Sequence, residues 1–142
     1  MEVLNAERSE DLTAMQRRLH DVWLQLPETM PIGTVRLEGL DDRETLLPVR
    51  TFGPFAQFER RRAKVVLVVD HVVAAELIDA AQIGSLNFAN ISFDEGESTV
   101  HLEGHVPVKL RLRVDQLEVR VEITDETVAA GRTWGLRPRS SA

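Results

Sequence analysis

Residues 100–123 read VHLEGHVPVKLRLRVDQLEVRVEI, and the spacing of their apolar residues decides the expected fold. Successive side chains of a strand point to opposite faces, so residues of one parity form one face. The apolar residues occupy even positions before Asp115–Gln116 and odd positions after it: Val100, Leu102, Val106, Val108, Leu110, Leu112 and Val114, then Leu117, Val119, Val121 and Ile123. This change of parity predicts a hairpin with a two-residue loop at Asp115–Gln116, which pairs Leu112 with Val119. The C-terminal third is therefore expected to be an antiparallel sheet with one buried face.

The preceding segment indicates further strands of the same meander. Leu86–Phe93 and Ser98–Gly104 are rich in apolar residues and flank a polar, glycine-containing turn, which predicts a hairpin. Gly104 and Pro107 interrupt the even-position pattern. We expect a bulge or bend there within one strand, not two independent strands.

Three segments are expected to be helical. Ser9–Leu26 has apolar residues at helical spacing and a serine suited to the N-cap. His71–Gln82 is expected to be a central helix, with Asp70 as its N-cap and Gly84 just past its end. A short helix is expected at Asp125–Ala130.

The middle of the chain predicts strands and one aromatic loop. Thr34–Leu40 alternates apolar and charged residues, and Lys64–Val69 is a short valine-rich run typical of a central strand. Thr45–Val49 contains Pro48, which confines it to an edge or a bulge. Thr51–Phe58 holds three of the five phenylalanines around a Gly-Pro turn. We expect an ordered loop tucked against the core; an exposed aromatic binding loop is the alternative.

These elements predict an α+β fold: a two-layer sandwich of mostly antiparallel sheet, with an N-terminal helix and a central helix packed on one face. We expect a single domain over residues 1–142, with a folded core at 8–131 and a flexible tail at 132–142. The order helix, strands, helix, strands, with a pI near 5.2, is similar in general layout to small acidic secretion chaperones. This is a likeness of architecture only.

Composition limits the classes of function. The net charge of −6 weighs against nucleic-acid binding, although Arg60, Arg61, Arg62 and Lys64 form a basic cluster. The longest unbroken apolar run, Val65–Val69, is far shorter than a membrane span, so no membrane association is expected. The chain has no cysteine and begins without a basic, apolar leader, which favours a cytoplasmic location.

One set of side chains has the chemistry of a metal site. His101, Glu103 and His105 alternate along one strand and share its outward face. Imidazole and carboxylate groups are ordinary zinc ligands, so the three predict a candidate metal site. A solvent-facing polar strand is the alternative, because neighbours on one face are about 7 Å apart.

No catalytic motif is present, so the sequence leaves open whether the chain is an enzyme. Asp70-His71 has the residue types of an oriented general base, but Asp70 is better explained as a helix N-cap and His71 as a residue of the first turn. No glycine-rich phosphate loop or nucleophile elbow occurs, and no cofactor is predicted.

Two hypotheses of function follow. The first is a non-catalytic protein-interaction or chaperone-like module that acts as a homo-oligomer, most simply a homodimer, or that binds another protein. The second is a small-ligand-binding or enzymatic domain with a pocket between sheet and helices. Its expected lining is Trp23, Phe52, Phe55, Phe58, Phe88 and His71.

Overall fold

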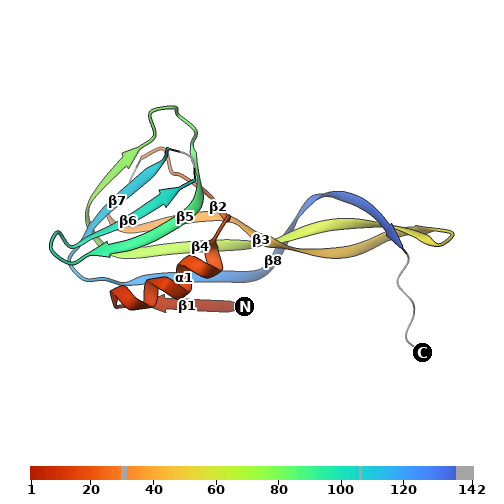
Figure 1. The fold of residues 1–142 in the computed structure, drawn as a ribbon, viewed down its shortest axis with the longest axis horizontal. Coiled ribbons are helices and arrows are strands. Elements are labelled where there is room, and N and C mark those ends of the chain that lie inside the picture. Colours follow the sequence, from red (N-terminus) through yellow and green to blue (C-terminus); the bar gives the residue numbers. More distant parts are fainter. Residues whose placement is uncertain (30–31, 106, 137–142) are drawn as a thin grey trace.

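The computed structural model describes residues 1–29, 32–105 and 107–136. Within these ranges the chain forms a sheet of eight strands and one α-helix, α1 (Leu12–Leu19), preceded by a 3-10 turn at Ser9–Asp11 (Figure 1). The strands are β1 (Glu2–Ala6), β2 (Trp23–Gln25), β3 (Gly33–Phe52), β4 (Phe55–Ile78), β5 (Ser85–Asp94), β6 (Thr99–Gly104), β7 (Lys109–Val114) and β8 (Val119–Leu136).

The sheet closes on itself as a six-stranded antiparallel barrel. Its strand order is β4-β3-β2-β5-β6-β7, and β7 pairs back onto the C-terminal part of β4. β8 pairs with the N-terminal part of the same β4 edge, and β1 lies outside β8. Closure leaves these six strands without a free edge inside the barrel.

Buried and exposed side chains alternate along the strands, and the buried ones form one apolar core inside the barrel. On β4, Val65, Leu67 and Val69 are buried in this core, and Phe88 of β5 is its largest fully buried side chain. α1 adds three buried residues to the same core: Leu12, Met15 and Leu19. The helix therefore packs its apolar face against the sheet, as its helical spacing predicts.

The prediction of an antiparallel sheet is confirmed, but the predicted C-terminal hairpin is wrong. β7 and β8 do not pair; they follow one another along the same edge of β4, where Val114 lies opposite Val72 and Val119 opposite Val69. Leu112 and Val119 are nevertheless both buried in one core, as the parity predicts. The odd or even positions of the apolar residues identify the buried face of each strand. This pattern does not depend on whether two strands pair with each other or each pair with a third strand.

The predicted central helix is also wrong. Residues 71–78 continue β4 and pair with β7, and residues 79–84 connect β4 to β5. Asp70 does not cap a helix; its carboxylate accepts a hydrogen bond of 2.9 Å from the Thr34 hydroxyl. Tertiary pairing of Val72–Ile78 with β7 has overridden the weak helical periodicity. With one short helix, the fold is dominated by sheet, and the likeness to a helix–strands–helix–strands layout loses its basis.

Other boundaries differ for local reasons. The helix predicted at Ser9–Leu26 ends at Leu19, because Asp21 takes a left-handed φ of 68° and the chain then enters β2. The segment after Gly104 is a reversal between two strands, β6 and β7, that pair with each other, not a bulge within one strand. The short helix predicted at Asp125–Ala130 is part of β8.

The part of the expected tail at 132–136 is also the end of β8, and residues 137–142 lie outside the described residues. The hairpin predicted from Leu86–Phe93 and Ser98–Gly104 is confirmed as β5 and β6.

Beyond the barrel, three strands continue as a long arm (Figure 1). We define the arm as Arg43–Phe52 of β3, Phe55–Ala63 of β4 and Thr127–Leu136 of β8, with β4 in the middle. We call the point where the arm joins the barrel its root. No helix in the described part of the chain is long and apolar enough to cross a membrane.

Candidate functional site

The end of the arm exposes a cluster of large apolar side chains. Phe55 of β4 lies opposite both Phe52 of β3 and Leu136 of β8, and Gln57, the next residue on this face of β4, lies opposite Trp134. Residues directly opposite one another share a face of the sheet. The exposed fractions are 77% for Phe52, 75% for Leu136, 52% for Trp134 and 50% for Phe55. We call these four residues the apolar tip.

The turn at the end of the arm is built by Gly53-Pro54. Gly53 has a φ of 58°, which a glycine adopts without steric cost, and Pro54 follows at the second central position. A positive φ at the first central position is the pattern of a type II′ turn, whose twist suits a two-residue hairpin. Phe52 and Phe55 flank this turn directly. The sequence Phe-Gly-Pro-Phe therefore holds two aromatic residues side by side at the end of the hairpin.

On the opposite face of the arm, the aromatic residue Phe58 is buried. Phe58 is only 8% exposed and Ala56 is fully buried. Phe58 packs across Gly135, where an added Cβ would lie 3.3 Å from the ring. Around Phe58 this face of the arm is thus internally packed, whereas no described element covers the face with the apolar tip.

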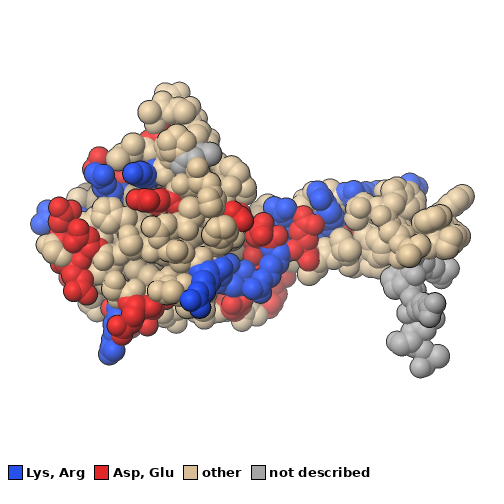
Figure 2. All heavy atoms as spheres, in the orientation of Figure 1, with Lys and Arg blue, Asp and Glu red and all other residues tan. Residues whose placement is uncertain are grey.

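The arm is basic and the remainder of the chain is acidic. The three arm segments contain six arginines and two glutamates, whereas residues 1–42 and 64–126 contain nine lysines and arginines and twenty-one acidic residues. Figure 2 shows acidic side chains at the end of the barrel away from the arm, charged bands at the root and uncharged surface at the end of the arm. On the tip face, the guanidinium of Arg50 lies 5.5 Å from the ring centre of Trp134, a cation–π distance.

Both outer edges of the arm are unpaired among the described residues. β2 pairs with β3 only at residues 38–40, and β1 pairs with β8 only at 119–123. Pro48 and a register shift next to it interrupt the β3 edge. The β8 edge of the arm contains no proline. Unpaired edges and an open apolar face are features of a surface that binds another protein.

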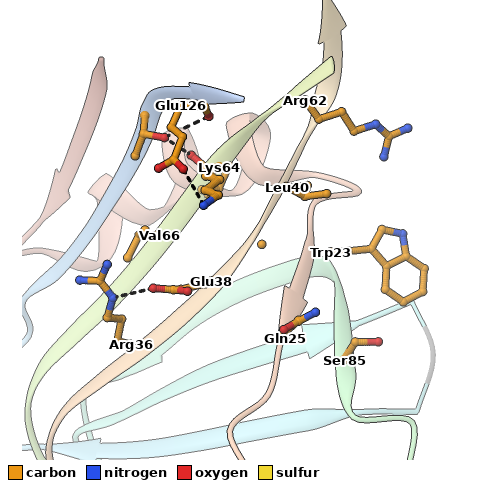
Figure 3. A pocket seen from close by; sticks show the side chains of 13 residues that line it. Trp23, Gln25, Arg36, Glu38, Leu40, Arg62, Lys64, Val66, Ser85 and Glu126 are labelled. Atoms are coloured by element: carbon orange, nitrogen blue, oxygen red, sulfur yellow. Dashed lines mark hydrogen bonds and ion pairs between the residues drawn. The ribbon is translucent and has the colours of Figure 1, made fainter. Parts of the chain in front are cut away.

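A groove of about 670 Å³ lies at the root of the arm (Figure 3). Trp23 stands at one side of it with 44% of its surface exposed, and Leu40 and Val66 contribute apolar surface. Its rim is charged. The Lys64 ammonium is 2.8 Å from Glu126, a contact that raises the pKa of Lys64, and Arg36 is 3.1 Å from Glu38.

The structure separates the residues that the sequence analysis placed in one ligand pocket. Phe52 and Phe55 form part of the apolar tip, and Phe58 packs on the other face of the arm. Trp23 lines the root groove, and Phe88 is fully buried in the barrel. His71 lies where β4 passes from β8 to β7, with its Nε2 2.7 Å from Glu118. These six residues do not line a common cavity.

The expected metal ligands are likewise divided. His101 and Glu103 lie on β6, opposite Arg111 and Lys109 of β7. His105 instead lies beside His20 and Asp21, the only group of potential metal ligands of this kind in the described part of the chain.

Two residues of the tip, Trp134 and Leu136, were not among the predicted site residues, because they fall in a segment that was expected to be a loose tail apart from Trp134. Their alternation with Gly135, which places Trp134 and Leu136 on one face of an extended strand, is the signal that could have found them.

Comparisons with known proteins do not assign the chain to a family. No protein-family model matches the sequence, and no significant match was found among curated proteins or solved structures. The class of protein is therefore described by its architecture: an antiparallel barrel with a projecting basic arm that ends in an apolar tip.

Proposed function

We propose that this chain is a non-catalytic protein-interaction module that forms a homodimer through its arm. The single observation that carries this proposal is the apolar tip: three aromatic residues and a leucine, each at least half exposed, on one face of the arm that no described element covers. Isolated exposed apolar residues are common on protein surfaces, but a contiguous cluster of this kind marks an interaction site.

The size of the apolar tip suits the centre of an interface. Aromatic side chains bury roughly 150–250 Å² each, so the tip offers roughly 400–500 Å² at its exposed fractions. A standard interface buries about 800 Å² per partner. The arm must therefore contribute further contacts around the tip, and Arg50 and Arg132 stand on the same face to do so.

Charge favours a second copy as the partner. The arm carries an excess of arginine, and the rest of the same chain carries an excess of acidic residues. Two copies that lie with their arms antiparallel would place Arg50 and Arg132 of each arm near the root of the other, where Asp42, Asp125 and Glu126 are exposed. Such an arrangement is isologous, the commonest symmetry of soluble homodimers. Electrostatic complementarity then sets orientation and the rate of association.

Sedimentation velocity over a concentration series tests this proposal. We expect the wild type to convert from monomer to dimer as concentration rises, and F52S/F55S to stay monomeric at every concentration. L46S is the matched control, because Leu46 is 55% exposed on the arm but lies on the opposite face, facing the same way as Arg60. A monomeric wild type, or a double variant that dimerises as the wild type does, would refute the proposal.

A cytoplasmic location belongs to the same proposal and is supported by the lack of cysteine, which is compatible with a reducing compartment. Fractionation of cells that express the full chain checks it. Recovery in the soluble cytoplasmic fraction is expected, and recovery outside the cytoplasm contradicts it.

A second candidate function is the binding of a small molecule in the root groove. The groove volume of about 670 Å³ is within the usual range of ligand sites, and Trp23 offers a half-exposed aromatic face. A thermal-shift screen against small molecules tests it, since binding to the native state raises the melting temperature. A hit whose shift is lost in W23S supports the groove, whereas no hit, or a shift unchanged in W23S, contradicts it.

A further inference from the structure

Two loops bring two imidazoles and a carboxylate together at a site distinct from the arm. His20 and Asp21 follow α1, and His105 follows β6. The Nε2 of His105 is 2.9 Å from Oδ1 of Asp21, and the Nδ1 of His20 is 3.0 Å from Oδ2. One ligand atom from each of the three residues lies within 4.8 Å of the others. The imidazole rings of His20 and His105 meet edge to face, with centres 5.0 Å apart.

The backbone fixes both loops on the same strand. The amide of Asp21 donates a 3.0 Å hydrogen bond to the carbonyl of Phe88, and the amide of His105 donates a 2.9 Å bond to the carbonyl of Asn87. Asn87 and Phe88 are neighbours in β5, so the two loops are held side by side. The barrel, and not the side chains alone, therefore determines the separation of Asp21 and His105.

Asp21 has an unusual backbone conformation at this point. Its φ of 68° lies in the left-handed region, which aspartate and asparagine tolerate better than most residues. The amide of Val22 then bonds back to the carbonyl of Leu19. This tight turn brings the carboxylate of Asp21 within hydrogen-bond distance of both imidazoles.

We propose that His20, Asp21 and His105 bind one Zn²⁺ ion. Imidazole nitrogen and carboxylate oxygen are ordinary zinc ligands, with metal–ligand distances of about 2.0–2.2 Å. Ligand atoms on one tetrahedral zinc are then about 3.4 Å apart, close to the two N–O distances of 2.9 and 3.0 Å. Both histidines are exposed, so small rotations of their side chains close the remaining separation. The metal replaces the imidazole protons that otherwise make the two contacts to Asp21.

Three protein ligands leave a fourth position for water. Zinc sites of this kind differ from structural sites, in which four protein ligands close the coordination shell. The side chains of the three residues are 40–55% exposed, which leaves a path for the ion and for the water. The site would thus hold an accessible zinc ion that also ties the α1–β2 turn to the β6–β7 loop.

Isothermal titration of the full chain with zinc chloride tests this inference. We expect one zinc ion per chain in the wild type, and D21N and H105N to bind at least about 10- to 100-fold more weakly, the loss typical when a supporting partner of a metal site is removed. Asparagine tolerates the left-handed φ at position 21, so D21N keeps the turn. H101N and H71N are the matched controls and should bind zinc as the wild type does, because neither residue belongs to the cluster.

A second measurement needs no substitution. In imidazole NMR spectra of the wild type, zinc should shift the signals of His20 and His105 and leave those of His71 and His101 unchanged. The absence of saturable binding would overturn the inference, as would binding that survives in D21N and H105N. Loss of binding in H101N would point to the strand of His101 and Glu103 instead and would also overturn it.

Discussion

Arg18 of α1 donates two hydrogen bonds, of 2.9 and 2.7 Å, to the two carboxylate oxygens of Asp41, at the point where β3 leaves the barrel to form the arm. Asp41 is only 3% exposed, and Arg18 also reaches Glu2 of β1 at 3.0 Å. This one guanidinium therefore joins the helix, an outer strand and the root of the arm. Burial raises the pKa of Asp41, but the hydrogen bonds from Arg18 and from the Arg43 amide outweigh it and leave the pKa below its ordinary value.

Loss of the Asp41 carboxylate should destabilise the protein strongly. D41N leaves the buried guanidinium of Arg18 with only the half-exposed Glu2 as a charged partner, and removal of one member of a buried ion pair costs about 3–5 kcal/mol. Urea unfolding followed by circular dichroism measures the change. The control is the double variant R18M/D41L, which removes both charges and should be closer to the wild type than D41N is. A loss below about 1 kcal/mol in D41N would contradict the structural role of the pair.

The same ion pair predicts how stability depends on pH. Because the pKa of Asp41 is lower in the folded state than its ordinary value of 3.8, the pair contributes its full stability above that value. The contribution is lost as pH falls through the lower, folded-state pKa. The melting temperature of the wild type should therefore fall more steeply than that of D41N as pH decreases below about 4. Parallel melting curves for the two proteins across this range would be inconsistent with a lowered pKa.

Truncation of two phenylalanines should reduce stability to very different extents. F88A removes a fully buried ring from the barrel and should cost about 3–5 kcal/mol of unfolding free energy. F55A removes a ring that is half exposed at the arm tip, so the stability of the monomer should change by much less. Urea unfolding at a concentration where the chain is monomeric compares the two variants. Equal losses would mean that the tip is packed as a core.

Gly39 should be intolerant of any side chain. A Cβ at this position would lie 1.9 Å from the backbone oxygen of Trp23, so G39A must separate β2 from β3. We expect a marked loss of stability together with a changed environment of Trp23. G96A is the control, because the nearest atom to its added Cβ is a mobile carboxylate oxygen of Asp94 at 3.3 Å. Thermal unfolding followed by tryptophan fluorescence reports both effects. Equal stability of G39A and G96A would contradict the close approach.

The sequence was sufficient to predict which side chains are buried between residues 100 and 123, apart from Val106, which lies outside the described residues, because alternation is a local property of a strand. Leu112 and Val119 are both in the core as predicted. It was insufficient to identify the pairing, because β7 and β8 lie end to end along β4 and only tertiary structure shows this. The change of parity has the same appearance for a hairpin and for two strands that share a third as neighbour.

The candidate sites were harder to predict for the same reason. Phe52 and Phe55 are adjacent to a recognisable Gly-Pro turn, but whether that turn is tucked against the core or extended beyond it depends on the arm strands of β3 and β8. The prediction of a loop tucked against the core is wrong: Phe52 and Phe55 lie exposed at the end of a hairpin of two strands, and Phe58 is buried on the other face of the arm. The grouping of His105 with Asp21 depends on contacts between loops 84 residues apart, which periodicity cannot reveal.

The fluorescence of Trp134 over a concentration series tests the central claim, association through the arm, most directly. The chain has two tryptophans, so W23F leaves Trp134, half exposed at the tip, as the only indole. We predict that its emission shifts to shorter wavelength as concentration rises, because the partner covers the ring, and that the shift disappears when F52S/F55S is added. Emission that stays constant from dilute to concentrated protein would contradict association through the arm.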